Sequence, residues 1–117
     1  MKKGSWITIL IVLGVLALSL YLITKDNFNP NNNFPNENLV KCIASKSILY
    51  VQEGCIHCKN QEELFGDNYK FLNKFDCTQN FQLCLNEGIY GTPTWVIDNQ
   101  KYAKVLTIEE LKQMTGC

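Results

Sequence analysis

The sequence contains no arginine and no excess charge of either sign: its 11 basic residues are all lysines, and 11 acidic residues balance them. A nucleic-acid-binding protein needs a basic face to neutralise phosphates, and this balance supplies none. Nucleic acid is therefore not an expected partner. No Asn-x-Ser/Thr acceptor occurs, so N-glycosylation is not expected. At 117 residues the chain is also too short for a multidomain assembly.

Charge is missing altogether from one long segment. The 19 residues from Trp6 to Thr24 include no charged side chain, and most of them are Leu, Ile or Val. A helix of that length spans roughly 28 Å, close to the hydrocarbon thickness of a bilayer. Trp6 and Tyr21 lie near its two ends, where interfacial aromatic residues are common. We predict that residues 1–24 form a membrane anchor. The alternative is a cleaved signal peptide, which would have a shorter apolar core and a small-residue cleavage site.

The flanking charges predict the orientation of this anchor. Lys2 and Lys3 precede it, whereas Lys25 on the other side is offset by Asp26. The positive-inside bias then keeps the N-terminus in the cytoplasm and places the rest of this single-pass cell-membrane protein on the extracytoplasmic side. Residues 25–39 contain seven Asn and two of the three prolines. They cannot bury a core, and we predict a flexible linker, with residues 40–117 as the folded domain.

The pattern of apolar residues and breakers in those 78 residues predicts alternating elements. It indicates a short helix through Val40 and Ile43 capped by Asn38, a buried strand at Ser47–Val51, and a helix at Cys55–Phe65 ending at Gly66. A strand at Tyr69–Cys77 follows, and then a helix that is capped by Thr78, carries Phe81, Cys84 and Leu85, and stops at Gly88. The domain ends with a hairpin of Thr94–Ile97 and Lys101–Val105 and a last helix with a capping box at Thr107. This order predicts an α/β domain with a mixed sheet flanked by helices.

All six cysteines lie in this domain, at Cys42, Cys55, Cys58, Cys77, Cys84 and Cys117. An even number of cysteines in a small domain suits an oxidising compartment, because so short a chain buries little core and disulfides stabilise it. Cys77 and Cys84 link a strand end to the next helix, and we predict a structural disulfide, with a catalytic relay pair as the alternative. Cys42 and Cys117 can pair with each other, stay free or form an intermolecular bond.

The motif Cys55-Ile56-His57-Cys58 lies between a predicted strand and a predicted helix. Its first thiol should therefore lie at the helix N-terminus, where unpaired N–H groups and the helix dipole stabilise a thiolate. Two thiols spaced by three residues at a helix start can form a reversible disulfide. Protonated His57 would further favour the thiolate and raise the oxidising power of the pair. We expect Cys55 and Cys58, with His57, to be catalytic.

Pro93 is the only proline of the predicted domain. It lies in Gly91-Thr92-Pro93-Thr94, at the entrance of a strand, which makes it a candidate for a cis peptide bond. In a mixed sheet of this order the Pro93 loop would face the two cysteines of the CxxC motif.

With these features the chain resembles a thioredoxin-fold oxidoreductase, and within that superfamily it is most similar to the thioredoxin-like domain fused to bacterial vitamin K epoxide reductase homologues. The stretches that carry the resemblance are Cys55 to Cys58 with Gln61, Leu64-Phe65-Gly66, Cys77 and Cys84, Gly88-Ile89, Pro93-Thr94-Trp95, and Glu109-Glu110-Leu111. They cover nearly all of residues 46–116.

The resemblance implies a thioredoxin-like domain with Cys55 as the nucleophile, Cys58 as the resolving cysteine and Thr92-Pro93 as a loop that contacts substrate. It also implies exchange with the thiols and disulfides of exported proteins. No cofactor or metal is expected, and a separate membrane partner of the vitamin K epoxide reductase or quinone-linked type would reoxidise the site. Leu49 stands where thioredoxins proper have a buried acid, which leaves Glu53 or water as the proton acceptor for Cys58.

Two other functions are compatible with the sequence. A tethered reductase would have the same layout but the opposite direction of electron flow. A metal-binding or carrier module would use the four cysteines from Cys55 to Cys84, whose spacing resembles a zinc site except for its wide last gap.

Overall fold

The computed structural model describes residues 2–25 and 34–117, which belong to two separate compact units, Met1–Asn33 and Phe34–Cys117. In the first unit, helix α1 spans Lys2–Lys25. Its segment Gly4–Leu22 has a mean hydropathy of 2.3 and is long and apolar enough to cross a membrane. Trp6 and Tyr21, near its two ends, expose 71% and 60% of their surface. Residues 26–33 of the predicted linker lie outside the described residues.

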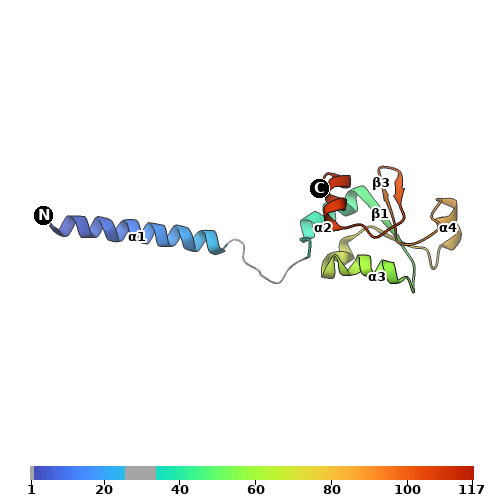
Figure 1. The fold of residues 1–117 in the computed structure, drawn as a ribbon, viewed down its shortest axis with the longest axis horizontal. Helices are drawn as coiled ribbons and strands as arrows, with labels where there is room; N and C mark the ends of the chain where they lie inside the picture. Colours follow the sequence, from blue (N-terminus) through green and yellow to red (C-terminus); the bar gives the residue numbers. More distant parts are fainter. Residues whose placement is uncertain (1, 26–33) are drawn as a thin grey trace. The chain divides into compact units, whose positions relative to one another are not determined.

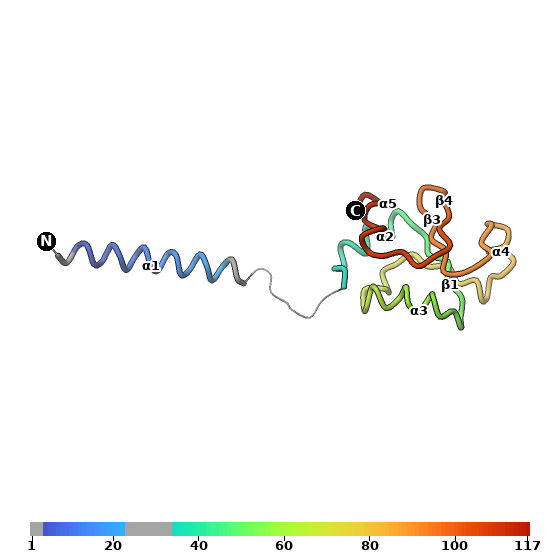
Figure 2. The backbone as a smooth tube through the Cα atoms, in the orientation of Figure 1, coloured from blue at the N-terminus to red at the C-terminus, as the bar shows by residue number. Residues whose placement is uncertain are grey.

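The second unit is built on a four-stranded sheet in the order β2-β1-β3-β4. Figure 1 labels β1 and β3, and Figure 2 also labels β4. Its strands are β1 at Ser47–Val51, β2 at Lys74–Asp76, β3 at Thr94–Ile97 and β4 at Gln100–Tyr102. β1 pairs with β2 in parallel and with β3 antiparallel, and β3 pairs antiparallel with β4. The sheet is therefore mixed, as predicted.

Helices flank the sheet (Figure 1). They are α2 at Glu37–Lys46, α3 at Ile56–Glu63, the 3-10 helix η1 at Gly66–Phe71, α4 at Phe81–Asn86 and α5 at Ile108–Thr115. Apart from η1, this is the predicted sequence of elements. The thioredoxin-like α/β fold class, preceded by one apolar helix, is confirmed.

The alternation of side chains along β1 sorts the core into two clusters, because successive residues of a strand point to opposite faces. Leu49 lies in the larger cluster, with Trp95, with Val40 and Ile43 of α2 and with Leu111 of α5. Tyr50 lies in the smaller one, with the disulfide-bonded Cys77 and Cys84 and with Ile89. The larger cluster is where α2 and α5 bury their apolar sides against the sheet.

Two local signals act as predicted. Thr107 caps α5 through a complete capping box: its hydroxyl accepts from the Glu110 N–H at 3.1 Å, and the Glu110 carboxylate accepts from the Thr107 N–H at 2.8 Å. Asp98 and Asn99 both adopt positive φ angles, 50° and 62°, in the turn between β3 and β4. Such a turn matches the twist of a hairpin, and short polar residues tolerate it.

Four local predictions were wrong. The second hairpin strand, predicted at Lys101–Val105, is β4 at Gln100–Tyr102, because only these residues pair with β3. Asn36, not Asn38, caps α2 by accepting from the Leu39 N–H at 2.9 Å, and the compact unit already begins at Phe34. Thr78 does not cap α4, because its hydroxyl instead accepts from the Glu53 N–H at 2.7 Å. Most of the predicted strand Tyr69–Cys77 is the 3-10 helix η1 and the turn that follows it, so that β2 contains only three residues.

Candidate active site

The CxxC motif lies at the junction between β1 and α3. Cys55 is the N-cap residue of α3, and its Sγ atom accepts from the backbone N–H of Cys58 at 3.1 Å. The next amide, Lys59 N–H, donates to the Cys55 carbonyl at 3.2 Å. The first cysteine therefore lies where the helix presents unpaired N–H groups, an environment that stabilises a thiolate after the disulfide is reduced.

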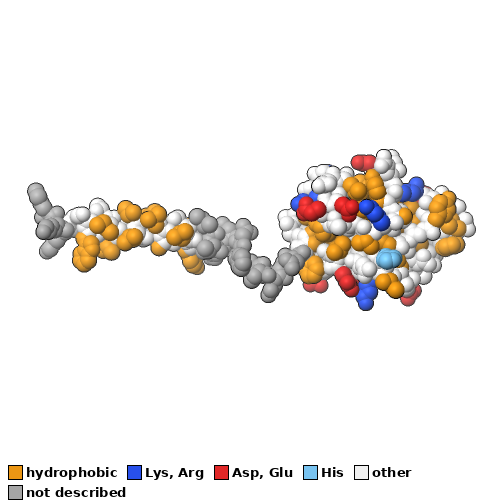
Figure 3. Space-filling view, in the orientation of Figure 1, with side chains coloured by type: hydrophobic (Ala, Val, Ile, Leu, Met, Phe, Trp, Pro, Cys, Tyr) orange, Lys and Arg blue, Asp and Glu red, His pale blue; other side chains and the backbone are white. Residues whose placement is uncertain are grey.

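Cys55 and Cys58 form a disulfide with their Cα atoms 5.2 Å apart. The two cysteines differ in access: Cys58 is buried, with 7% of its surface exposed, whereas Cys55 is half-buried. An attacking thiolate can therefore reach Cys55 more easily than Cys58. Between them, Ile56 is 75% exposed and His57 is also exposed; the histidine colour is visible on the surface of the domain in Figure 3.

The loop before β3 faces this disulfide, as the strand order predicts. The Thr92–Pro93 peptide bond is cis and Pro93 is buried. The Thr92 carbonyl oxygen lies 3.4 Å from the Sγ atom of Cys55, although the two residues are 37 positions apart in the chain. Pairing of Tyr50 with Thr94 across β1 and β3 holds the loop at this edge of the sheet. In the reduced protein this carbonyl can accept a hydrogen bond from the Cys55 thiol.

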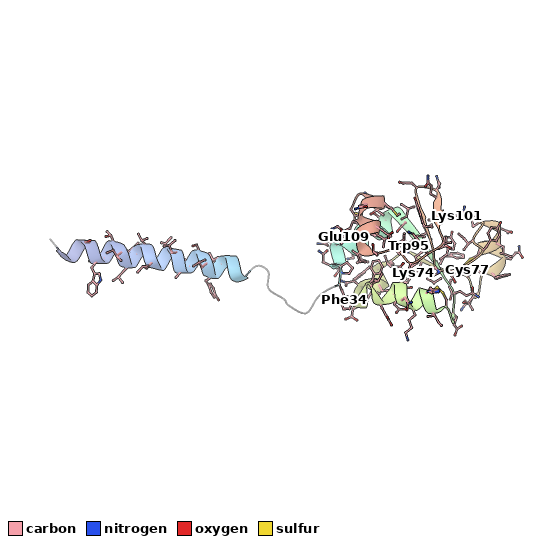
Figure 4. The ribbon with its side chains drawn as sticks, in the orientation of Figure 1. Phe34, Lys74, Cys77, Trp95, Lys101 and Glu109 are labelled. Carbon is pink, nitrogen blue, oxygen red and sulfur yellow. A yellow bond between two sulfur atoms is a disulfide. The ribbon has the colours of Figure 1, made fainter. Side chains whose placement is uncertain are left out.

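A buried side chain connects the two halves of the site. Gln61, in α3, is fully buried; its Oε1 accepts from the Trp95 indole N–H at 2.9 Å and from the Leu106 N–H at 2.8 Å, and its Nε2 donates to the Leu106 carbonyl at 2.9 Å. Trp95 follows the Pro93 loop by two residues and lies at the centre of the unit (Figure 4). The sequence marked Gln61 only through the resemblance, and no local pattern predicts these partners.

The other four cysteines form two disulfides. Cys77 and Cys84 are both buried and are bonded with a Cα–Cα distance of 5.9 Å, and the Cys77 N–H donates to the Val51 carbonyl at 2.8 Å. Figure 4 shows Cys77 toward the α4 side of the domain. Cys42 and Cys117, whose pairing the sequence left open, are bonded to each other with a Cα–Cα distance of 6.0 Å. The four cysteines of the zinc-like spacing are thus divided between two disulfides.

Among the described residues no acidic side chain is buried, so none can serve as a buried proton acceptor for Cys58. Leu49 is fully buried in the larger core cluster. Glu53, one of the two expected alternatives, is exposed in the loop after β1. Among residues 2–25 and 34–117, no group of three His, Cys, Asp or Glu residues is arranged to hold a metal ion.

Comparison with known proteins places the chain beside a disulfide-exchanging enzyme. It is 34% identical, over 77 residues, to thiol-disulfide oxidoreductase LTO1 of Arabidopsis thaliana. The match covers 58% of this chain but only 20% of the relative, so the chain spans about a fifth of that protein's length. No protein-family model matches the sequence.

Proposed function

We propose that the chain is a membrane-tethered thiol-disulfide oxidoreductase that acts on exported proteins outside the cytoplasm, with Cys55 and Cys58 as its redox pair. The observation that carries this proposal is the position of the disulfide. Its accessible sulfur lies at the N-terminus of α3 and 3.4 Å from the Thr92 carbonyl of the cis-Pro93 loop. The similarity to a thiol-disulfide oxidoreductase supports the same reaction.

In the oxidising direction the site works in two exchange steps. A substrate thiolate attacks the Cys55 sulfur, the Cys55–Cys58 bond breaks, and Cys58 leaves as a thiolate that takes up a proton. A second substrate thiolate then attacks the substrate sulfur of the mixed disulfide, and Cys55 leaves. The substrate has lost two electrons and gained a disulfide, and the Cys58 N–H, 3.1 Å from the Cys55 sulfur, stabilises the departing Cys55 thiolate.

Net oxidation requires the site to be reoxidised, and we propose a separate membrane partner of the vitamin K epoxide reductase or quinone-linked type. The helix N-terminus favours the reduced form of the pair, which supports an oxidase. The equilibrium potential of the Cys55–Cys58 pair against glutathione tests the direction. We expect a value toward the DsbA end of the range from about −270 mV (thioredoxin) to about −120 mV (DsbA). A value below about −250 mV would identify a reductase.

The roles of the two cysteines are tested by trapping. In Cys58→Ala the mixed disulfide through Cys55 cannot be resolved, so covalent adducts with substrate proteins should accumulate. Cys55→Ala should accumulate none, because the remaining sulfur is buried. Adducts in Cys55→Ala alone would reverse the assignment.

The proposed topology has its own test. After mild reduction of intact cells, an impermeant thiol reagent should label Cys55, which is half-buried rather than enclosed. Labelling that occurs only after lysis would place the domain in the cytoplasm and remove the argument for exported substrates.

A further inference from the structure

An open groove of about 830 Å³ lies beside the redox disulfide. Its walls are the loop that follows β1, the exposed side of α3, the beginning of η1 and the end of β2, and both Cys55 and Cys58 line it. A polypeptide that presents a cysteine to Cys55 therefore has room to lay its neighbouring residues in this groove.

The charged side chains of the groove are almost all acidic. They are the carboxylates of Glu53, Glu62, Glu63, Asp67 and Asp76, and the single ammonium group of Lys59. All six residues are exposed, and no ion pair within the described residues involves any of them. The chain as a whole is neutral. Five of its 11 acidic residues but only one of its 11 lysines line the groove, a formal charge of −4 beside the disulfide.

Lys74, on which the charge of Glu62 acts, does not line the groove. Its ammonium group donates to the Tyr69 carbonyl at 2.8 Å and lies 4.4 Å from the centre of the Tyr69 ring. The negative charge of the groove nonetheless acts on Tyr69, which lines it. Burial, and secondarily the charge of Glu62, raise the pKa of Tyr69 to about 12.

Beside Thr92 the lining residues are uncharged. There a small hollow of about 30 Å³ reaches Thr92 and is lined by uncharged residues, among them Phe81 and Tyr90, which are 60% and 85% exposed. Of these two hollows, the groove is the one whose lining can discriminate substrates by charge.

We propose that this groove binds a cationic segment of the substrate, so that the protein exchanges disulfides preferentially with cysteines that have Lys or Arg neighbours. The inference rests on the proposed function and names its substrate class. A cleft lined by one sign of charge concentrates the field and speeds the association of oppositely charged partners. Lys and Arg side chains can also lay their aliphatic stems on apolar walls, here Val51 and Ile56, while their charged ends reach the carboxylates.

The test is a single-turnover reaction of the fully oxidised full-length chain in neutral detergent micelles. The reductants are dithiol peptides that differ only in having Lys, Gln or Glu beside the cysteines. The Cys55–Cys58 disulfide is itself the oxidant: each peptide gains a disulfide and the protein gains two thiols. Rates are divided by those of the same peptides with hydroxyethyl disulfide, an uncharged reagent, to remove differences in intrinsic thiol reactivity.

We expect the Lys peptide to react about tenfold or more faster than the Glu peptide at low ionic strength. The ratio should fall toward one as salt shortens the Debye length from about 10 Å at 0.1 M to about 3 Å at 1 M. The variant Glu62→Gln/Glu63→Gln/Asp67→Asn, which reduces the groove charge to −1, should lose most of the preference. The control Glu37→Gln/Glu87→Gln/Glu109→Gln makes the same change in charge outside the groove and should keep it.

Equal normalised rates for the Lys and Glu peptides would overturn the inference, and so would a preference that survives in the groove variant or is lost in the control. These results leave disulfide exchange itself intact. Failure to react with all three peptides would instead overturn the proposed function, and the inference with it.

Discussion

The disulfide between Cys42 and Cys117 should be the strongest covalent contribution to the stability of the domain. It joins α2 to the residue after the C-terminal glycine of α5 and closes a loop with a sequence separation of 75. In the chain-entropy treatment, a loop of that length restricts the unfolded chain by about 4.5 kcal/mol at 25 °C. The Cys77–Cys84 disulfide, with a separation of 7, gives about 2.4 kcal/mol in the same treatment.

The perturbation is the double variant Cys42→Ser/Cys117→Ser, which leaves no unpaired thiol. Small domains are stable by only about 5–15 kcal/mol, so the expected loss is a large fraction of the total. Urea unfolding of the full chain in detergent micelles would measure it. The buried Trp95 serves as the fluorescent reporter in a Trp6→Phe background, because the chain has only these two tryptophans.

The two loop lengths predict the order of the two losses as well as their size. Loss of Cys42–Cys117 should lower the free energy of unfolding by about 2 kcal/mol more than loss of Cys77–Cys84. An equal or smaller loss would refute it, and would mean that packing between α2 and α5 already holds the chain end in place. Because neither cysteine lines the groove beside the active site, the exchange rate at Cys55 should stay close to that of the unmodified protein.

Three further predictions concern single features of the domain. Replacing Cys77 and Cys84 by Ala should lower the urea midpoint while retaining exchange at Cys55; lost exchange with an unchanged midpoint would make them a relay pair. The Thr107 N–H and Lys104 lower the pKa of Glu110, so the stability that Glu110 contributes is present above its usual pKa of 4.5 and is lost as the pH falls. The difference in unfolding free energy between wild type and Glu110→Gln should therefore shrink between pH 5.5 and 3, and a constant difference would contradict this assignment. Spectrophotometric titration should show one tyrosine ionising near pH 12, since burial and Glu62 raise the pKa of Tyr69 to about 12; an identical curve for Tyr69→Phe would disprove it.

The elements that the sequence predicted correctly are those defined by local chemistry. Residues 48–51 are a continuous apolar run, and together with Ser47 they form β1 with the predicted bounds because the sheet buries the strand on both faces. The capping box at Thr107 satisfies N–H groups within four residues and needs no distant partner. The strand-to-helix position of Cys55 follows from these same signals, which is why the CxxC geometry could be anticipated.

The error at Tyr69–Cys77 shows how a local signal misleads. Tyr69, Phe71, Phe75 and Cys77 recur at even spacing, as in a strand. In the structure Tyr69 and Phe71 belong to η1 and pack against the larger core cluster, whereas Phe75 packs against the smaller one. The even spacing therefore runs across two elements whose side chains pack on different faces of the sheet. The two-residue period of apolar side chains cannot by itself distinguish such a case from a single strand.

The pairing of cysteines that are far apart in the chain could not be predicted from the sequence, for a different reason. Six cysteines allow 15 sets of three disulfides, and nothing near Cys42 or Cys117 selects one. Their bond depends on α2 and α5 packing on the same core cluster, which is a property of the finished fold. The charge of the groove has the same origin, since Glu53 reaches it from the loop after β1 and Asp76 from β2.

The hydrogen bonds of Gln61 have a consequence for how this sequence can diverge. An amide supplies both the acceptor that the Trp95 and Leu106 N–H groups need and the donor that the Leu106 carbonyl needs, whereas Leu supplies neither and ionised Glu no donor. Leaving a buried indole N–H without a partner costs about 1–3 kcal/mol. Among related sequences, positions 61 and 95 should therefore vary together: a chain that keeps Trp at 95 should keep Gln at 61, and an alignment becomes a direct test of these hydrogen bonds.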